Sequence, residues 1–341
     1  MKIGLTSDMH FGYTHGSKVN EAGVNVREQD FYDAAFLGLH SLLSRGVDII
    51  VDGGDIAHVP APKKRAISNL INLINQAEIP FYSVDGNHTS LKSSSDIHLY
   101  DILNQECKNF HGFIGHGITH HGIAMVPHAY DPNITMSRIE EVMKIGDPIM
   151  LVGHFAATDI VYDNARVPFE FLPADIPVFL GHYHRHTEQV RPLPTYIGST
   201  EHTAWDQWNY PTGVSIYDTS AGTLEYITHH SRKFVNLLAT DENYLDIFDE
   251  EDLTDAVVRL TIETGREKYG TLNLRETKRK AQAAGALSFH YRRAKDKKDE
   301  TNRVEAQEVT SLTESWNTFV DDISVDDRDR VRELGIEALN A

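Results

Sequence analysis

The sequence predicts an α/β fold in which two β-sheets pack as a sandwich and helices flank them, four layers in all. Short apolar runs typical of buried parallel strands alternate with stretches whose apolar residues recur at helical spacing. The stretch 51–58 shows the pattern best, because it follows the apolar run 48–50 and its two glycines let the backbone turn before Asp55. Open α/β sheets bind ligands at this end of their strands, so Asp55 is a candidate site residue.

The expected elements follow one another along the first two thirds of the chain. Strands are expected over residues 2–6, 48–52, 80–84, 122–127, 148–152 and 177–180. Helices are expected over 26–43, over 64–76, and once more beyond a Ser-rich turn before residue 122. Short strands around Tyr196 and over 213–217 and 224–227 are expected to complete a second, less regular sheet.

Charge divides the chain into parts of opposite sign. The formal net charge is -18, which at first argues against a polyanionic partner. Residues 256–298, however, carry 12 Lys and Arg against 4 Asp and Glu, whereas residues 299–341 carry 4 against 12. Such asymmetry indicates separate domains.

We therefore expect three domains, which cover residues 1–239, 240–298 and 299–341. The second would be a small basic α+β unit that follows an acidic linker, with strand 256–263, helix 272–285 and strand 287–293. The third would be an acidic tail of two short helices.

Composition indicates a protein of the cytoplasm. Cys107 is the only cysteine, so no internal disulfide can form and a reducing compartment fits. No apolar run is long enough to cross a bilayer, which argues against a membrane partner, and Asp8 interrupts the first apolar run too early for a secretory signal.

Five of the expected strand ends carry side chains that bind metals. They are Asp8 with His10, Asp55, Asn87 with His88, His154, and His182 with His184. Residues i and i+2 of an extended backbone face the same side, so each pair with that spacing can point at one centre. Carboxylate, imidazole and amide ligands suit Mn2+, Fe2+ or Zn2+ better than Ca2+. Two such ions would activate a water and neutralise charge on a phosphate.

The order of these motifs, Asp-x-His, Gly-Asp, Gly-Asn-His, Gly-His and Gly-His-x-His, resembles that of the calcineurin-like metallophosphoesterases. Three features narrow the resemblance to the SbcD-type nuclease subunits of double-strand-break repair, and within them to the small recombination endonuclease subunits of T-even-like phages. His58 follows Asp55 by three residues, as in those nucleases, and the element 196–201 resembles their Gly-Ser element. The chain length, the small basic domain and the acidic tail also match the phage branch.

The resemblance implies the metallophosphoesterase fold and a role for each motif residue. One ion would be held by Asp8, His10, Asp55 and His184, and the other by Asp55, Asn87, His154 and His182. His88 would protonate the leaving oxygen, and His58 would position His88 or the phosphate. Two positions depart from the family: Thr89 stands where Asp usually follows Gly-Asn-His, and His202 stands where relatives often have Arg.

The same resemblance implies a DNA nuclease of recombination and repair that uses two divalent ions. Mn2+ is the favoured ion, with Mg2+, Fe2+ and Zn2+ as further candidates. Exonuclease action on duplex ends, endonuclease action on single strands, a homodimer and an SbcC-type ABC ATPase partner are implied as well; the chain itself carries no Walker phosphate loop. If a phage encodes it, the protein would work in the host cytoplasm.

Two other functions remain open at this point. One is a phosphatase or nucleotide phosphodiesterase of the same superfamily, although protein phosphatases carry Asp-Arg-Gly after Gly-Asp where this chain has Ile56-Ala57-His58. The other is a DNA-binding subunit that performs no chemistry.

Residues other than the metal ligands are expected to contact DNA and a partner protein. Candidates for contacts with the DNA phosphates are Lys278, Arg279, Lys280, Arg292 and Arg293. In the tail, Trp316 and Phe319 lie on one apolar helix face that we expect to dock onto a partner protein.

Overall fold

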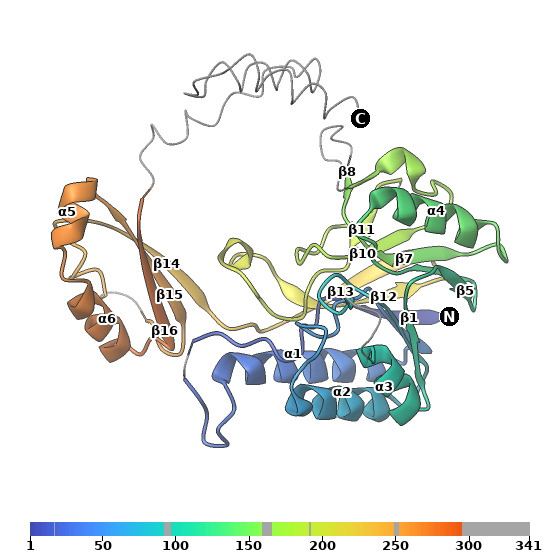
Figure 1. Cartoon of the computed structure of the whole chain (residues 1–341), viewed down its shortest axis with the longest axis horizontal. Helices are drawn as coiled ribbons and strands as arrows, with labels where there is room; N and C mark the ends of the chain where they lie inside the picture. The colour runs from blue at the N-terminus through green and yellow to red at the C-terminus, as the bar shows by residue number, and fades with distance from the viewer. Residues whose placement is uncertain (17, 92–96, 159–165, 191, 249–251, 295–341) are drawn as a thin grey trace, which may run out of the picture. The chain divides into compact units, whose positions relative to one another are not determined.

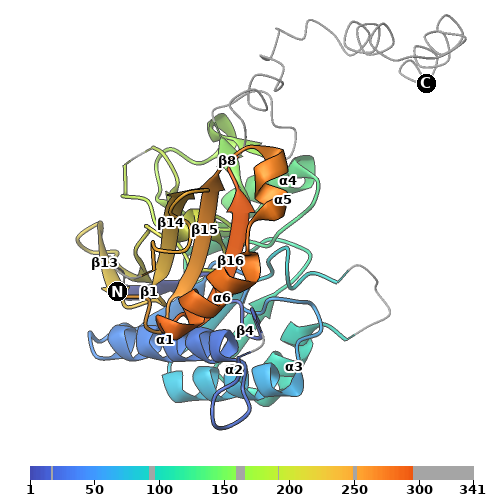
Figure 2. The ribbon, with the colours of Figure 1, turned by 90° about the vertical axis from the view of Figure 1, so that its left-hand side faces the viewer.

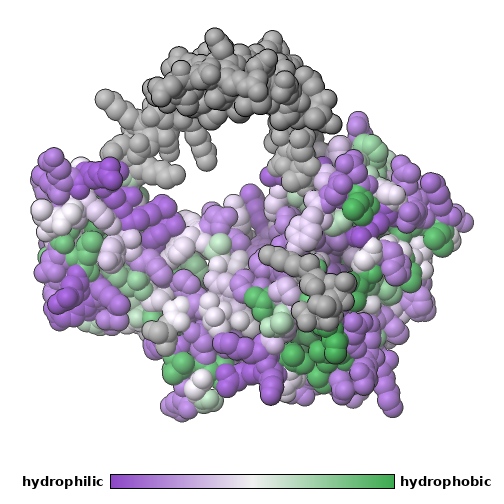
Figure 3. Space-filling model, viewed as in Figure 1, coloured by the Kyte–Doolittle hydropathy of each residue, from purple (hydrophilic) through white to green (hydrophobic). Residues whose placement is uncertain are grey.

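A computed structural model describes residues 1–341 except 17, 92–96, 159–165, 191, 249–251 and 295–341. The predicted two-helix tail therefore lies outside the described residues. No helix among those described is long and apolar enough to span a bilayer. On the face shown in Figure 3, hydrophilic side chains prevail and hydrophobic ones form small, scattered patches.

Two large sheets form the centre of the fold. The six-stranded sheet has the order β13-β12-β1-β2-β3-β4 and consists of β1 (Lys2–Thr6), β2 (Ile49–Asp52), β3 (Phe81–Val84), β4 (Phe110–Phe113), β12 (Thr212–Asp218) and β13 (Thr223–His229). The five-stranded sheet has the order β11-β10-β7-β6-β5 and consists of β5 (Ile118–His120), β6 (Ile123–Val126), β7 (Met150–His154), β10 (Val178–Gly181) and β11 (Thr195–Tyr196). A small pair is formed by β8 (Ala157–Thr158) and β9 (Val167–Pro168).

Parallel pairing brings the ends of the central strands to common edges. β1, β2 and β3 run parallel, with Ile3 opposite Ile49 and Ile50 opposite Phe81. β7 and β10 are likewise parallel, with Gly181 opposite His154. The residues that follow these strands therefore lie together at the carboxyl-terminal edge of each sheet. The candidate site is built from these residues.

The prediction that the strands around residues 213–217 and 224–227 belong to the second sheet was wrong. β12 and β13 do not complete the second sheet; they extend the first, because β12 pairs antiparallel with β1 and β13 pairs antiparallel with β12. Of the three late strands, β11 alone joins the five-stranded sheet, beside β10.

Four helices cover the outer faces of the sheets. They are α1 (Val26–Leu43), α2 (Lys64–Ala77), α3 (Leu99–Glu106) and α4 (Pro132–Met143). α1 spans the residues expected for it: the Asn25 side chain accepts hydrogen bonds from the backbone of Arg27 and Glu28 and so caps its first turn. Figure 1 shows α1, α2 and α3 together on one side of the six-stranded sheet and α4 beside β7.

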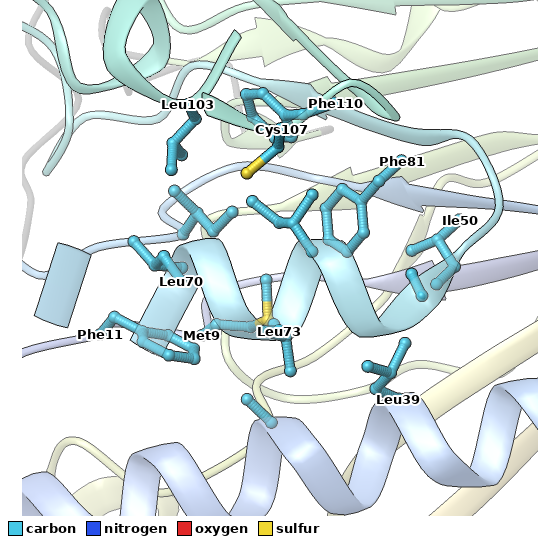
Figure 4. Close-up of a cluster of buried hydrophobic side chains, with 14 of the residues drawn as sticks. Met9, Phe11, Leu39, Ile50, Leu70, Leu73, Phe81, Leu103, Cys107 and Phe110 are labelled. Atoms are coloured by element: carbon cyan, nitrogen blue, oxygen red, sulfur yellow. The ribbon is translucent and has the colours of Figure 1, made fainter. Parts of the chain in front are cut away.

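Alternation along the strands produces three layers of core. Ile50 packs with the helices α1 and α2, whereas its neighbours Ile49 and Val51 face the second sheet. Figure 4 shows the helix-side core, where Leu70 and other α2 side chains meet the aromatic rings of β3 and β4. A third cluster lies between the five-stranded sheet and α4. The sequence-predicted sandwich with flanking helices is confirmed.

The later part of the chain contains a three-stranded sheet of order β14-β15-β16, visible in Figure 2. Its strands are β14 (Phe234–Thr240), β15 (Val257–Glu263) and β16 (Ser288–Arg293), and the helices between them are α5 (Arg266–Thr271) and α6 (Leu274–Ala283). The expected boundary between residues 239 and 240 thus falls inside β14. By contacts the chain divides into two compact units, residues 1–237, 245–260 and 273–290 in one and 238–244, 261–272 and 291–341 in the other.

Candidate metal centre

The predicted ligands gather at the ends of five strands. Asp8 and His10 follow β1, Asp55 follows β2, Asn87 and His88 follow β3, His154 ends β7, and His182 and His184 follow β10. These strands belong to both large sheets, so the site lies where the two sheets meet at the carboxyl ends of their parallel strands. Asp8, Asp55 and His154 are 0%, 1% and 0% exposed, which is unusual for charged groups that lack a strong partner.

One cluster consists of Asp8, His10 and His184. The Nε2 atoms of His10 and His184 face each other at 3.1 Å, and His184 Nε2 lies 3.6 Å from a carboxylate oxygen of Asp8. All three residues offer a ligand atom within a small common volume.

A second cluster forms around Asn87. Its side-chain oxygen lies 3.0 Å from His154 Nε2 and 2.9 Å from His182 Nδ1. Asp55 joins it, since its carboxylate lies 3.3 Å from His154 Nε2. Asp55 also groups with Asp8 and His154, so it stands between the two clusters.

These distances fit a pair of divalent cations. Ligand atoms about 2.1 Å from an octahedrally coordinated ion lie about 3.0 Å from one another, which is the spacing seen in both clusters. The Asn87 oxygen is an acceptor that faces two imidazole nitrogens, those of His154 and His182, and such atoms approach this closely when a cation or a proton lies between them. The chemistry of the donor set, imidazole with carboxylate and amide oxygen, suits Mn2+, Fe2+ or Zn2+.

Residues that sequence reasoning missed fix the orientation of the ligands. The Nδ1 atom of His154 donates to the carbonyl of Gly53 at 2.8 Å, which leaves Nε2 for the cluster. Thr203 holds His184 in the same way: its hydroxyl lies 2.9 Å from His184 Nδ1 and donates to Gln207. The short element Trp205–Gln207 thus supports the metal centre, although no motif marked it.

The backbone is strained at the ligands themselves. Asp8, His10, Asp55 and His182 have φ values of 51°, 45°, 53° and 85°, in the region that favours glycine. Each such residue costs about 1–2 kcal/mol, which is typical of functional sites.

Two glycines leave room for the ligands. A Cβ on Gly54 would lie 2.4 Å from the His154 ring, and one on Gly86 would lie 2.1 Å from the Asp55 carboxylate. Side chains at either position would displace a ligand.

The two predicted catalytic histidines lie beside the first cluster. His88 donates its backbone N–H to Asp55 at 2.8 Å, and its Nδ1 atom lies 2.9 Å from the carbonyl of His58. The rings of His58 and His88 stack at 5.0 Å, and His58 Nδ1 lies 3.3 Å from His10 Nδ1. The carbonyl of His58 therefore fixes the His88 ring, and a protonated His88 would keep its second N–H for another acceptor.

Burial and neighbouring charges shift the titration of the site. Burial raises the pKa of Asp8, although His184 and His154 act in the opposite direction. For Asp55 burial also acts to raise the pKa, but His154, His10 and His88 together outweigh it and hold the pKa of that carboxyl below its usual value. Burial, and then the charge on His154, lowers the pKa of His182 to about 3. His182 is thus neutral at physiological pH, the form in which imidazole binds metals.

The predicted phosphate-binding residues lie apart from these clusters in the sequence and fall in both compact units. Arg279 on α6 pairs with Glu276 at 2.6 Å, and Lys280 lies 3.6 Å from Asp246. Arg292 on β16 bonds Thr261 at 3.2 Å. Lys278 is exposed, and Arg293 is half-buried.

A two-sheet α/β sandwich with paired metal-binding clusters at its strand ends is the architecture of a metal-dependent phosphoesterase. The sequence profile described as calcineurin-like phosphoesterase matches residues 1–186, more than half of the chain. The chain belongs to this family, whose members use a dinuclear metal site, and it is a hydrolase of that class.

Two relatives carry the name DNA double-strand break repair protein Mre11. The one from Thermoplasma acidophilum is 27% identical over 244 residues, which cover 64% of this chain and 62% of that protein. The one from Halobacterium salinarum is 28% identical over 361 residues, 97% of this chain and 85% of that protein. This chain thus spans less than two thirds of the Thermoplasma relative. The solved structure of TT1561 of Thermus thermophilus aligns with a TM-score of 0.45 and 13% identity over 67% of this chain and 98% of that one.

Proposed function

We propose that this protein is a two-metal DNA nuclease of recombination and repair, of the SbcD type and its phage branch. The observation that carries the proposal is the pair of clusters that share Asp55, with His88 fixed beside them. Relatives named for double-strand break repair support DNA as the substrate. The donor set of imidazole, carboxylate and amide oxygens suits Mn2+, Fe2+ or Zn2+, and among these the resemblance to SbcD-type nucleases favours Mn2+ as the proposed ion.

Each site residue has a proposed task. Asp8, His10, Asp55 and His184 hold one ion, and Asp55, Asn87, His154 and His182 hold the other. When bound, the two ions lower the pKa of a water and neutralise charge on the phosphate. His88 donates a proton from Nε2 to the leaving oxygen, and the His58 carbonyl holds the ring through Nδ1. No covalent intermediate is proposed, because the bound ions would supply an activated water as nucleophile and His88 the proton for the leaving oxygen.

The remaining parts of the chain have proposed roles in binding. The basic part of the chain around α6 and β16 contacts the DNA backbone through Lys278, Arg279, Lys280, Arg292 and Arg293. Residues 299–341 dock onto an SbcC-type ABC ATPase, and the nuclease works as a homodimer in the cytoplasm. Light scattering of the purified chain, alone and with the ATPase, tests both associations, because a monomer that does not bind the ATPase contradicts them.

Cleavage assays test the central proposal. The full chain is incubated with end-labelled linear duplex, circular single-stranded DNA and p-nitrophenyl phosphate, with Mn2+, Mg2+ or chelator, and with or without the ATPase. We expect both DNA substrates to be cut with Mn2+ and left intact with chelator. Hydrolysis of the monoester alone would favour a phosphatase instead.

Matched variants separate catalysis from binding. Asp55→Asn and His88→Ala are expected to abolish cleavage while DNA affinity in a gel-shift assay survives. His120→Ala, which changes an exposed histidine of β5, serves as control and retains full cleavage. Equal loss of cleavage and of DNA binding in the first two variants would make these residues structural and contradict their catalytic role.

A further inference from the structure

A pocket of about 400 Å³ adjoins the metal centre. The ligand candidates His182 and His184 form part of its wall, and Tyr183, Arg185, Gln207 and Tyr210 form much of the rest. Because two ligands line it, its occupant lies directly next to a phosphate held by the ions. A pocket of this volume is at the small end of the range for small-molecule sites, which suits one ring system and its sugar.

Aromatic rings and one guanidinium line much of the wall. The guanidinium carbon of Arg185 lies 4.6 Å from the centre of the Tyr210 ring, a cation–π contact. The Tyr183 ring packs 4.8 Å from the ring of Tyr196. Tyr196 is buried and its hydroxyl accepts from the backbone N–H of Ala157, which fixes this part of the wall. Arg185 brings a positive charge to the lining and Asp206 a negative one.

Rigid tyrosine faces and a stacked arginine bind one chemical class particularly well. Nucleobases stack on aromatic rings and on guanidinium planes irrespective of sequence. We propose that this pocket takes the nucleobase next to the cleaved phosphodiester, so that the DNA strand is bound with one base removed from its stack. The inference rests on the proposed nuclease function and adds to it a contact that metal ligands alone do not supply.

A base bound in the pocket is no longer stacked on its neighbours or paired with the opposite strand. Removal from the stack costs least for an unpaired base. The protein therefore cuts next to an unpaired or mismatched nucleotide faster than inside a stable duplex.

Fluorescence tests occupancy without relying on cleavage. Single-stranded DNA with one 2-aminopurine is titrated with the full chain carrying His88→Ala, in Mn2+, and gel analysis verifies that the DNA stays intact. Stacking on the pocket wall changes 2-aminopurine fluorescence. We expect the change to be lost when Tyr210→Ala or Arg185→Ala is added and retained with Tyr210→Phe, which keeps the ring. Trp208→Ala, which alters a 47% exposed aromatic of the same loop outside the residues that line the pocket, is the matched control and keeps the change.

A free nucleotide distinguishes the source of the base. 2-Aminopurine deoxyriboside 5′-monophosphate is titrated under the same conditions. A change with this nucleotide but not with the oligonucleotide overturns the assignment to a DNA strand.

Cleavage of abasic DNA completes the test. The protein with His88 intact is given strands that carry either a base or an abasic site at each position flanking the scissile bond. Stacking predicts that the base-bearing strand is cut about fivefold faster or more, and that Tyr210→Ala removes this difference. Equal rates for both strands, or an effect of Trp208→Ala as large as that of Tyr210→Ala, overturns the base pocket alone. Failure to cut either strand overturns the nuclease function, and the pocket assignment with it.

Discussion

The hydroxyl of Thr89 donates a 2.5 Å hydrogen bond to the carboxylate of Asp85. Ser90 donates to the second oxygen of Asp85 at 2.6 Å, and the backbone N–H of Gly86 donates to Thr89 at 3.0 Å. These bonds close the turn that carries Asn87 and His88. Thr89 stands where the family it resembles usually has Asp; the structure has a buried carboxylate at position 85, which accepts from the hydroxyl of Thr89.

Thr89→Val should lower the free energy of unfolding by about 1–3 kcal/mol, because a buried oxygen of Asp85 loses its hydroxyl donor and the buried N–H of Gly86 loses its acceptor. Valine keeps the shape of threonine, so packing changes little. Thr89→Ser keeps the hydroxyl and is expected to retain most of the stability. Denaturant unfolding of the three proteins measures the difference; equal destabilisation by valine and serine would show that the hydroxyl has no such role.

Thr203→Val should weaken metal binding. The Thr203 hydroxyl accepts from His184 Nδ1 and so keeps His184 Nε2 directed at the first cluster. Loss of such a partner lowers metal affinity about 10–100-fold. Titration calorimetry with Mn2+ measures this affinity, and Thr203→Ser is the matched control. Unchanged affinity in the valine variant would show that the Thr203 hydroxyl does not orient the His184 ring for metal binding.

The features that could be predicted from the sequence are those caused by residues that lie close together in the chain. Asp55 was identified from the sequence because an apolar strand, two glycines and a carboxylate are consecutive, and parallel strands then bring such ends together. Helix α1 was predicted over its full length for a similar reason: its apolar residues recur at helical spacing within one continuous stretch.

The remaining features depend on partners far away in the sequence. The apolar pattern of β12 does not reveal that its neighbour is β1, some two hundred residues earlier, so β12 was assigned to the wrong sheet. Thr203 lies in a loop of no regular pattern, and its role depends on where His184 is placed by another strand. Short elements such as β5 are too brief for periodicity to show.

Asp52 should make the metal-free protein less stable as pH rises. Its carboxylate is fully buried and accepts from Ser83 and Gly54, and burial raises its pKa well above the ordinary value. The folded protein then holds this proton more tightly than the unfolded chain. The resulting stabilisation is present below the ordinary pKa and is lost as pH rises through the raised one.

Asp52→Asn removes this dependence, so with chelator present the wild type should lose stability relative to the variant as pH rises from the ordinary carboxyl pKa of about 4 through the raised one. Denaturant unfolding at a series of pH values measures the difference. Asp218 provides a control of opposite sign, since hydrogen bonds from Ser220 and Ala221 lower its pKa. Its contribution is lost as pH falls. A flat difference curve for Asp52→Asn would refute the raised pKa.

Arg27 at the start of α1 should be much costlier to replace than the exposed Arg45. It is 1% exposed, lies 3.2 Å from Glu201 and donates to the carbonyl of His202 at 2.6 Å. Arg27→Met keeps much of the volume but removes the charge that faces a buried carboxylate, which costs about 3–5 kcal/mol. The exposed pair of Arg45 and Glu225, 3.7 Å apart, is the comparison, and Arg45→Met should cost about 0–1 kcal/mol. Similar losses in thermal unfolding would contradict the difference in burial.

Mn2+ should stabilise the fold through the buried ligands. Binding to the folded state alone adds about 2.7 kcal/mol at a hundredfold excess over Kd. Because the chain has a net charge of -18, loosely bound cations on its acidic surface are the rival explanation for any such gain. Asp8→Asn removes a buried ligand and should abolish most of the gain, whereas Glu140→Gln removes an exposed carboxylate of α4 and should leave it intact. If both variants kept the Mn2+-dependent rise in unfolding free energy, the ions would be held at the surface and not at the clusters around Asp55.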